Sequence, residues 1–111
     1  MSKQTSLERD IQTLGRTEGN LKFLIYSYVD GRLDYKMAKA AISHEARFLE
    51  RLIEVRLGND YILLTTLWEI KTSPVKIVED EDAVHDIIGD CTTLIAVSKI
   101  VLEELKEVRD E

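Results

Sequence analysis

The apolar residues in the last part of the chain follow a helical period almost without interruption. Over Glu81–Val108, apolar or small residues recur in steps of three and four at Val84, Ile87, Cys91, Leu94, Ser98, Val101, Leu105 and Val108. Ile88, Ile95 and Leu102 widen this stripe by one position per heptad. Such a pattern is typical of an amphipathic helix that buries one face against other helices. At ~1.5 Å per residue the helix would be ~40 Å long, the full length of a small domain.

An earlier segment, Leu7–Val29, has the same period but contains two glycines. Its heptad positions are occupied by Leu7, Ile11, Leu14, Glu18, Leu21, Ile25 and Tyr28. Gly15 and Gly19 each weaken a helix by ~1 kcal/mol relative to alanine. The segment is therefore predicted to be helical, and whether the helix runs unbroken through the glycines is left open.

Two more helices are predicted between these segments. The first, Tyr35–Leu57, follows Asp34, which is a good N-cap residue. Its apolar arc contains Met37, Ala41, Phe48, Leu52 and Val55, broadened by Ala38 and Leu49. The second, Tyr61–Lys71, is shorter, and because short apolar runs are ambiguous it is also compatible with a strand that would pair with Val75–Val78. The helix is favoured, since a strand would have no other partner.

Together these patterns predict an all-α protein with a single domain over residues 1–111. Three long helices and one short helix would form an up-and-down bundle. The last helix is longer than the preceding hairpin of helices can easily cover, so we expect homodimerisation to complete the burial of its stripe. The residues expected at this interface are Val84, Ile88, Ile95, Leu102 and Leu105.

Composition narrows the classes of function. The 111 residues are 44% hydrophobic and 32% charged, a balance that is typical of globular proteins. The net charge of −6 and the lack of a Lys/Arg run argue against direct binding of nucleic acid. Neither an apolar signal-peptide region nor an apolar run of ~18 residues is found. The single cysteine, Cys91, lies on the apolar stripe, so a buried thiol and a reducing, cytoplasmic location are expected.

Charged residues inside the apolar stripes are the first candidates for chemistry. Glu18 takes a heptad position of the first helix, Glu45 lies within the arc of the second, and His44 lies at the edge of that arc. Glu18 and Glu45 are almost equally distant from the turn at Gly31, so an antiparallel hairpin would place them at the same height. Buried carboxylates require pairing, protonation or a metal ion. This layer is interpreted either as a metal- or proton-binding site or as a polar layer that sets helix register.

A second acidic cluster precedes and opens the last helix. It consists of Glu79, Asp80, Glu81, Asp82, His85, Asp86 and Asp90, with spacings that place neighbours on one helix face. Divalent cations bind such groups. Acids in a first helical turn also stabilise the helix dipole without any ligand, which is the favoured interpretation.

His44 is followed directly by Glu45 and, two positions later, by Arg47. This order resembles the phosphoacceptor motif of histidine kinases. The resemblance implies phosphotransfer, with His44 as the phosphoacceptor on a dimerising helical hairpin. Phe48 stands where that family has a proline, and the sequence contains no ATP-binding domain.

Glu50 and Glu54 on the second helix and Asp90 on the last form a further set of spaced acids. They resemble part of the Mg²⁺-binding motifs of MazG-type nucleoside triphosphate pyrophosphohydrolases, which carry Glu-Glu-x-x-Glu on one helix and Glu-x-x-Asp on a later one. The resemblance implies an all-α fold and metal binding by Glu50, Glu54 and Asp90. Arg51 and Ile87 occupy the other two ligand positions, and neither side chain can bind Mg²⁺.

The sequence contains no phosphate-binding glycine loop, nucleophile elbow, zinc spacing or catalytic Cys/His pair. The favoured function is therefore non-enzymatic: a small acidic helical protein that binds another protein, as an adapter, regulator or inhibitor, without a cofactor. A partner with a basic surface is expected, because the net charge is −6. The alternative is a metal- or nucleotide-binding bundle that resembles the MazG type, or a phosphotransfer hairpin.

Overall fold

The computed structural model describes residues 3–72 and 80–110, and every regular element in these residues is helical. The elements are α1 (Lys3–Gly15), α2 (Thr17–Val29), α3 (Tyr35–Leu52), the π-helical segment η1 (Ile53–Leu57), α4 (Tyr61–Thr72) and α5 (Asp80–Asp110). The all-α prediction is confirmed. Tyr61–Lys71 is helical, and Val75–Val78, the partner of the alternative strand, lies outside the described residues. No helix in the described part combines the length and the apolar character needed to cross a membrane.

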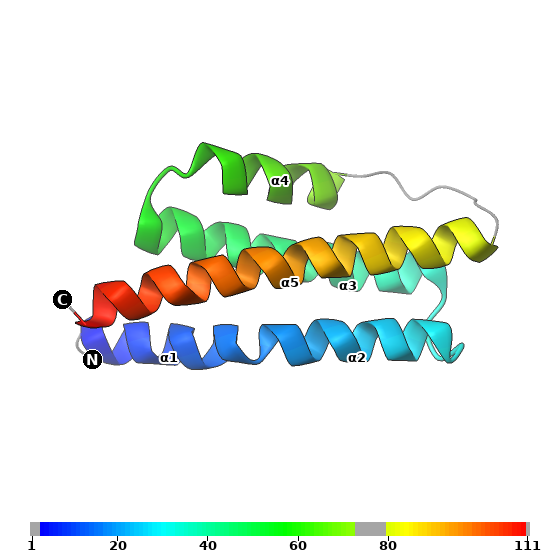
Figure 1. The fold of residues 1–111 in the computed structure, drawn as a ribbon, viewed down its shortest axis with the longest axis horizontal. Helices are drawn as coiled ribbons and strands as arrows, with labels where there is room; N and C mark the ends of the chain where they lie inside the picture. Colours follow the sequence, from blue (N-terminus) through cyan, green and yellow to red (C-terminus); the bar gives the residue numbers. More distant parts are fainter. Residues whose placement is uncertain (1–2, 73–79, 111) are drawn as a thin grey trace.

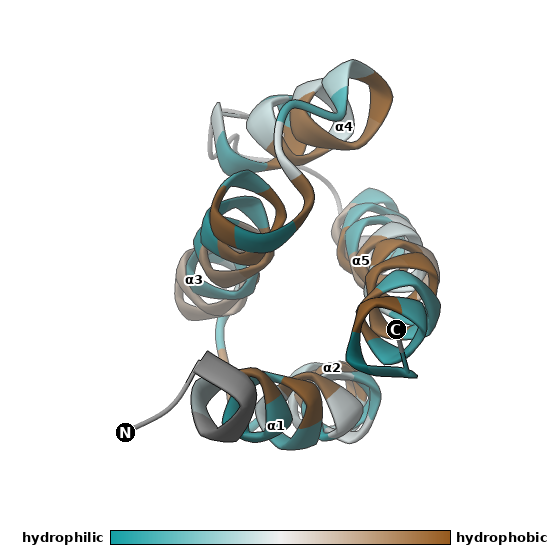
Figure 2. Ribbon diagram, turned by 90° about the vertical axis from the view of Figure 1, so that its left-hand side faces the viewer, coloured by the Kyte–Doolittle hydropathy of each residue, from teal (hydrophilic) through white to brown (hydrophobic). Residues whose placement is uncertain are grey.

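The helices run up and down along one long axis, and α5 extends over the whole length of the molecule (Figure 1). α1 and α2 follow one another almost in line, α3 returns beside them, and α4 reverses direction again. The structure measures 48 × 26 × 20 Å. Viewed along the axis, α3, α5 and the line of α1 and α2 surround the core, whereas α4 lies outside this triangle and packs mainly on α3 (Figure 2).

The first predicted helix is divided at Arg16. α1 ends at Gly15, and at the junction the N–H of Arg16 donates to the carbonyl oxygen of Thr13 at 3.1 Å. A Cβ atom placed on Gly15 or on Gly19 would meet nothing within 4 Å. The break therefore reflects the low helix propensity of glycine and not a close approach by a neighbouring helix.

The core contains apolar side chains from all five α-helices, whose apolar faces turn inward in Figure 2. On α3 and η1 the fully buried positions are Ala38, Ile42, Ala46, Leu49 and Ile53. Met37 and Val55, which were expected in the buried arc, are 53% and 69% exposed. Ala38, Leu49 and Leu52 of the predicted arc are buried, and Ala41 and Phe48 pack against the core. The prediction was wrong for Met37 and Val55, because the apolar residues cover two adjacent faces and their period alone does not show where the buried face ends.

The stripe of α5 is covered largely by the same chain. Its fully buried members are Ile87, Cys91, Leu94, Val101 and Leu105. α1 and α2 lie end to end along α5, so that together they match its length. Of the residues predicted at a dimer interface, Leu105 belongs to the core of its own chain, Val84, Ile95 and Leu102 are half-buried, and Ile88 is 37% exposed. An interface on this face of α5 would therefore have Ile88 as its best-exposed member.

Gly89 lies within α5, and a Cβ atom there would meet nothing within 4 Å. We expect Gly89→Ala to raise the free energy of unfolding by ~0.5–1 kcal/mol, since alanine favours a helix over glycine by about this amount. Gly58 has a φ of +82°, which side chains rarely adopt. Gly58→Ala, the control, should lower the free energy of unfolding by ~1 kcal/mol. Urea unfolding followed by circular dichroism measures both changes, and effects of the same sign would contradict this account.

Candidate functional site

Two places stand out among the described residues, a cluster of buried charges and a groove beside an exposed aromatic ring. The first lies between α3 and α5; we call it the Lys39 cluster, and it consists of Tyr35, Lys39, Asp86 and Asp90. The second is a groove between α2 and α3, which we call the α2–α3 groove. The charges of the Lys39 cluster bind one another and are not free for a ligand, whereas the α2–α3 groove is open to solvent. A smaller hollow, of about 240 Å³, is lined by the exposed rings of Tyr61 and Trp68 on α4.

Lys39 points from α3 toward the N-terminal part of α5, and its side chain is only 4% exposed. Its Nζ donates hydrogen bonds to Asp86 Oδ2 and to Asp90 Oδ2, both at 3.0 Å. Asp86 Oδ2 also accepts a hydrogen bond from the Tyr35 hydroxyl at 2.6 Å. The Lys39 Nζ lies 5.9 Å from the centre of the Tyr35 ring. The charge of the lysine is thus enclosed by two carboxylates and an aromatic ring.

The cluster keeps Lys39 protonated. Burial acts to lower the pKa of Lys39, but the hydrogen bonds and negative charges of Asp90 and Asp86 outweigh burial and leave this pKa above its usual value. Burial raises the pKa of Asp90, and Lys39 offsets only part of that increase. Burial and the hydrogen bond to Asp86 raise the pKa of the Tyr35 hydroxyl. Lys39 is therefore no nucleophile at neutral pH, and the cluster acts as an ion-pair link between α3 and α5.

Lys39 was not among the predicted site residues, although its partners Asp86 and Asp90 were noted as part of an acidic cluster. The predicted arc of α3 contained only apolar residues and therefore left out Lys39, which is buried beside Ala38. The sequence does contain a sign of this cluster. Tyr35 and Lys39 are four residues apart on α3, and Asp86 and Asp90 are four residues apart on α5. Residues with this spacing share a helix face, so two such pairs can meet across an interface.

The acidic cluster at the start of α5 is divided between two roles. Asp86 and Asp90 bind Lys39, whereas Glu81 and Asp82 are exposed near the N-terminal end of the helix. Acids at this end favour the helix dipole. His85 is also exposed, and Glu79 lies outside the described residues.

The structure does not bring Glu18 and Glu45 together. Glu18 Oε1 forms ion pairs with Lys22 at 3.1 Å and with Lys99 of α5 at 3.4 Å, and the hydrogen bond from Lys22 lowers the pKa of Glu18. Glu45 lies on the other side of α2, in the α2–α3 groove. The expected core position of Glu18 was wrong, because Thr17 is the buried residue of this turn.

The acids that resemble the MazG motifs are separated in the same way. Both carboxylate oxygens of Glu50 accept hydrogen bonds from Lys71 Nζ, at 2.8 and 2.9 Å, which links α3 to α4. Glu54 is exposed, and Asp90 belongs to the Lys39 cluster. Over residues 3–72 and 80–110, no three His, Cys, Asp or Glu side chains come close enough to hold a metal ion.

His44 lies on the outward face of α3. It is exposed and lines a shallow hollow of about 260 Å³ together with Arg47, Phe48 and Arg51. No ion pair of Arg47 or Arg51 is found in the described part of the chain, so this face carries a small positive area on an acidic protein. The His44 side chain is accessible, and the two arginines could neutralise an anion beside it.

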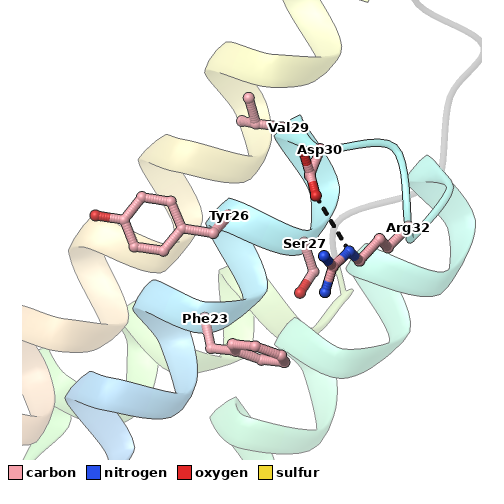
Figure 3. A pocket seen from close by; sticks show the side chains of 6 residues that line it. All are labelled: Phe23, Tyr26, Ser27, Val29, Asp30 and Arg32. Atoms are coloured by element: carbon pink, nitrogen blue, oxygen red, sulfur yellow. Dashed lines mark ion pairs between the residues drawn. The ribbon is translucent and has the colours of Figure 1, made fainter.

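The α2–α3 groove lies at the end of the bundle where the chain turns from α2 into α3, and its volume is about 490 Å³. It is lined by Asn20, Phe23, Leu24, Ser27, Arg32, Leu33, Ala41 and Glu45. Phe23 is 66% exposed, although its ring is apolar. A second hollow, of about 270 Å³, is also lined by Phe23 and reaches Tyr26 and Val29. The Phe23 ring extends from α2 toward α3 (Figure 3).

Two charged residues mark the ends of the groove. Arg32 lies in the connection between α2 and α3, where it forms an exposed ion pair with Asp30 at 3.1 Å (Figure 3). Glu45 is half-buried on α3, and no ion pair or hydrogen bond of its side chain is found among the described residues. Burial raises the pKa of Glu45, against an opposing effect of the neighbouring His44. The groove thus holds a carboxylate that has lost part of its hydration without gaining an ion pair or a hydrogen bond among the described residues.

Cys91 is buried in the core between the helices. Burial, together with the nearby charge of Asp90, raises the pKa of its thiol to about 12. The thiolate is the reactive form of cysteine, so this residue is a packing residue at neutral pH.

Comparisons with models of protein families, with curated proteins and with solved structures found no match to this chain. The function is therefore inferred from the residues and their geometry alone.

Replacing Lys39 with methionine is expected to lower the free energy of unfolding by ~2–3 kcal/mol. The change leaves two carboxylates without their cation, and partial exposure of Asp86 moderates the loss. Lys36→Met, at an exposed lysine on the preceding turn, is the control and should change stability by less than ~0.5 kcal/mol. Adding Asp86→Asn and Asp90→Asn to Lys39→Met should recover part of the loss. A triple variant that is no more stable than Lys39→Met in urea unfolding would show that charge pairing is not the cause.

The Cys91 thiol should react with a thiol reagent at least ~100-fold more slowly in the folded chain than in the urea-unfolded chain. Raising the pH from about 7 to about 9 should leave the folded chain almost unreactive, because its thiolate remains rare. Thr92→Cys in a Cys91→Ala background is the control, since Thr92 is the exposed neighbour on α5. Equal labelling rates of the two cysteines in the folded state would disprove the burial of Cys91.

Proposed function

We propose that this chain acts without catalysis of its own, by binding another protein as an adapter, regulator or inhibitor. The observation that carries this proposal is the exposure of Phe23 beside an open groove. Exposed aromatic side chains beside a hollow are typical of surfaces that bind other proteins. A partner would remove the Phe23 ring from water and fill the groove.

The charged residues support a binding role over a catalytic one. Glu18, Lys39 and Glu50 are each engaged by charges of opposite sign on a neighbouring helix. General acid or base catalysis requires a group that is free to exchange a proton with a bound substrate. Glu45 is half-buried and has no ion pair within residues 3–72 and 80–110, but it lies in an open groove that does not enclose a small molecule.

The expected partner presents an apolar residue next to a basic one. The apolar residue would pack against Phe23 and Leu24, and the basic residue would pair with Glu45. The net charge of −6 would speed association with a basic surface. The free, buried thiol of Cys91 supports a reducing compartment such as the cytoplasm as the place of action.

Replacing Phe23 with serine tests the proposal. Because Phe23 is exposed, Phe23→Ser should leave the fold intact, as circular dichroism would report, and should weaken partner binding at least ~10-fold. Tyr61→Ser removes an exposed aromatic residue from α4 and is the matched control. Proteins captured by the wild type would be purified. Calorimetry would then measure their affinities for all three chains.

Equal affinity of every captured protein for the wild type and for Phe23→Ser would contradict recognition through the groove. Native mass spectrometry of the purified chain with Mg²⁺ and nucleotide addresses the rival class, a metal- or nucleotide-binding bundle. A bare protein is expected, and a retained metal ion or nucleotide would overturn the non-enzymatic proposal.

A further inference from the structure

The α2–α3 groove places an apolar knob directly beside an apolar hollow. Phe23 is the knob, and Leu24, Leu33 and Ala41 line the hollow next to it. A surface that carries both a knob and a matching hollow can pair with a second copy of itself, because a two-fold axis places each knob opposite the hollow of the partner. Another protein would have to supply a complementary shape, whereas a second copy of this chain already has one.

The charges of the groove are ordered along its length. Arg32 lies in the connection at one end, Phe23 lies further along α2, and Asn20 lies beyond Phe23. Glu45 lies well inside α3, which runs back along α2, so it shares the end of the groove away from the connection. The groove is therefore acidic at the Glu45 end and apolar in the middle, and at its other end Arg32 carries a positive charge whose exposed pair with Asp30 is weak enough to be exchanged.

We propose that the α2–α3 groove is the contact surface of a symmetric dimer, in which two copies of the chain pack groove to groove in antiparallel directions. Phe23 of each copy would lie in the middle of the interface, against the hollow of the other. Arg32 of each copy would lie against Glu45 of the other.

Charge complementarity selects the antiparallel arrangement. With the two-fold axis across the groove, between Phe23 and the hollow beside it, each Phe23 faces the hollow of the other copy and each end of one groove meets the opposite end of the other, so that both Glu45 side chains gain a basic partner. With the axis along the groove, Arg32 would face Arg32 and Glu45 would face Glu45, which costs free energy at both ends. The antiparallel dimer thus supplies the ion pair that the half-buried Glu45 lacks in the described part of its own chain.

The net charge of −6 on each copy opposes the association only weakly. Charges beyond about 8 Å are largely screened at physiological salt, whereas the ion pairs and the Phe23 contact act at short range. The surface is small, so a weak dimer that exchanges with monomers is expected. This inference deepens the proposed function and rests on it in one respect: a second copy and another partner would compete for the same groove, so dimerisation would regulate partner binding.

Sedimentation velocity of the purified full chain, from low micromolar to near-millimolar concentration, measures the association directly. The wild type should show a reversible monomer–dimer equilibrium. Phe23→Ser should weaken it at least ~10-fold, and Trp68→Ser, which removes an exposed aromatic residue from α4, should not change it. A chain that stays monomeric at all concentrations would overturn the dimer. A dimer that ignores Phe23→Ser would overturn its assignment to the groove.

A charge exchange tests the antiparallel pairing. Arg32→Glu and Glu45→Arg should each weaken the dimer at least ~10-fold, because each makes both ends of the interface repulsive. Mixing the two variants should restore dimers that contain one chain of each, since an acidic side chain of one variant then faces a basic side chain of the other at both ends. A mixture that associates no better than the separate variants would overturn the pairing. Circular dichroism checks the fold of both variants, and Glu45→Gln replaces Glu45→Arg in the self-association measurement if the latter unfolds.

These outcomes separate the inference from the proposed function. A purified chain that remains monomeric but loses its captured partners with Phe23→Ser would disprove the dimer and support the binding function. A dimer that depends on Phe23, in a chain whose partners bind equally well to Phe23→Ser, would support the dimer and disprove partner recognition through the groove.

Discussion

The ion pairs of Lys39 with Asp86 and Asp90 are the constraint on which the arrangement of the helices depends. A buried lysine without its acids costs several kcal/mol, so only those positions of α5 that bring both aspartates to Lys39 are stable. Apolar contacts alone tolerate a changed register more easily, because apolar side chains can repack. The cluster therefore fixes α5 against α3 near the N-terminal ends of both helices, which run in the same direction (Figure 1). With its first turns held in this way, the rest of α5 lies along α2 and α1.

The same arrangement leaves the α2–α3 groove uncovered. α5 packs against one side of α2, and α4 packs on the side of α3 that faces away from α2 (Figure 2). α3, α5 and the line of α1 and α2 surround the core, and α4 does not cover the seam between α2 and α3. Leu24 is buried in this seam, but Phe23, one residue earlier, remains mostly in water. The open groove is a consequence of where α4 packs, and it leaves the apolar Phe23 ring exposed at its edge, where the proposed contacts would remove it from water.

The sequence predicted the helices well because their signals are local. The period of the apolar residues, the N-cap Asp34 and the glycines at the turns all act within one or two turns of a helix, and the bounds of α3 with η1 and of α4 agree closely with those expected. Which face of a helix is buried depends on the helices that pack against it, and the spacing of apolar residues does not show which helices these are. Met37 of α3 and Val55 of η1 continue an apolar row whose middle is packed on the core, but both lie exposed at its ends. Lys39 is buried because two aspartates distant in the sequence meet it. The predicted core position of Glu18 failed for the same reason. The sequence does not show that Lys99 of another helix lies beside Glu18 and pairs with it at the surface.

Ion pairs join several of the helix interfaces, but none joins the two helices that form the groove. Asp10 of α1 pairs with Arg56 of η1, and Glu50 of α3 pairs with Lys71 of α4. Glu18 of α2 pairs with Lys99 of α5, and Lys39 joins α3 to α5. Between α2 and α3, both of which lie wholly within the described residues, no ion pair is formed. Instead Glu45 lies half-buried at one end of their groove, and Arg32 lies at the other end in an exposed ion pair with Asp30. Burial disfavours the charge of Glu45, and Arg32 lies at the far end of the same groove. In the proposed dimer, a second copy turned end to end would place its own Arg32 beside Glu45.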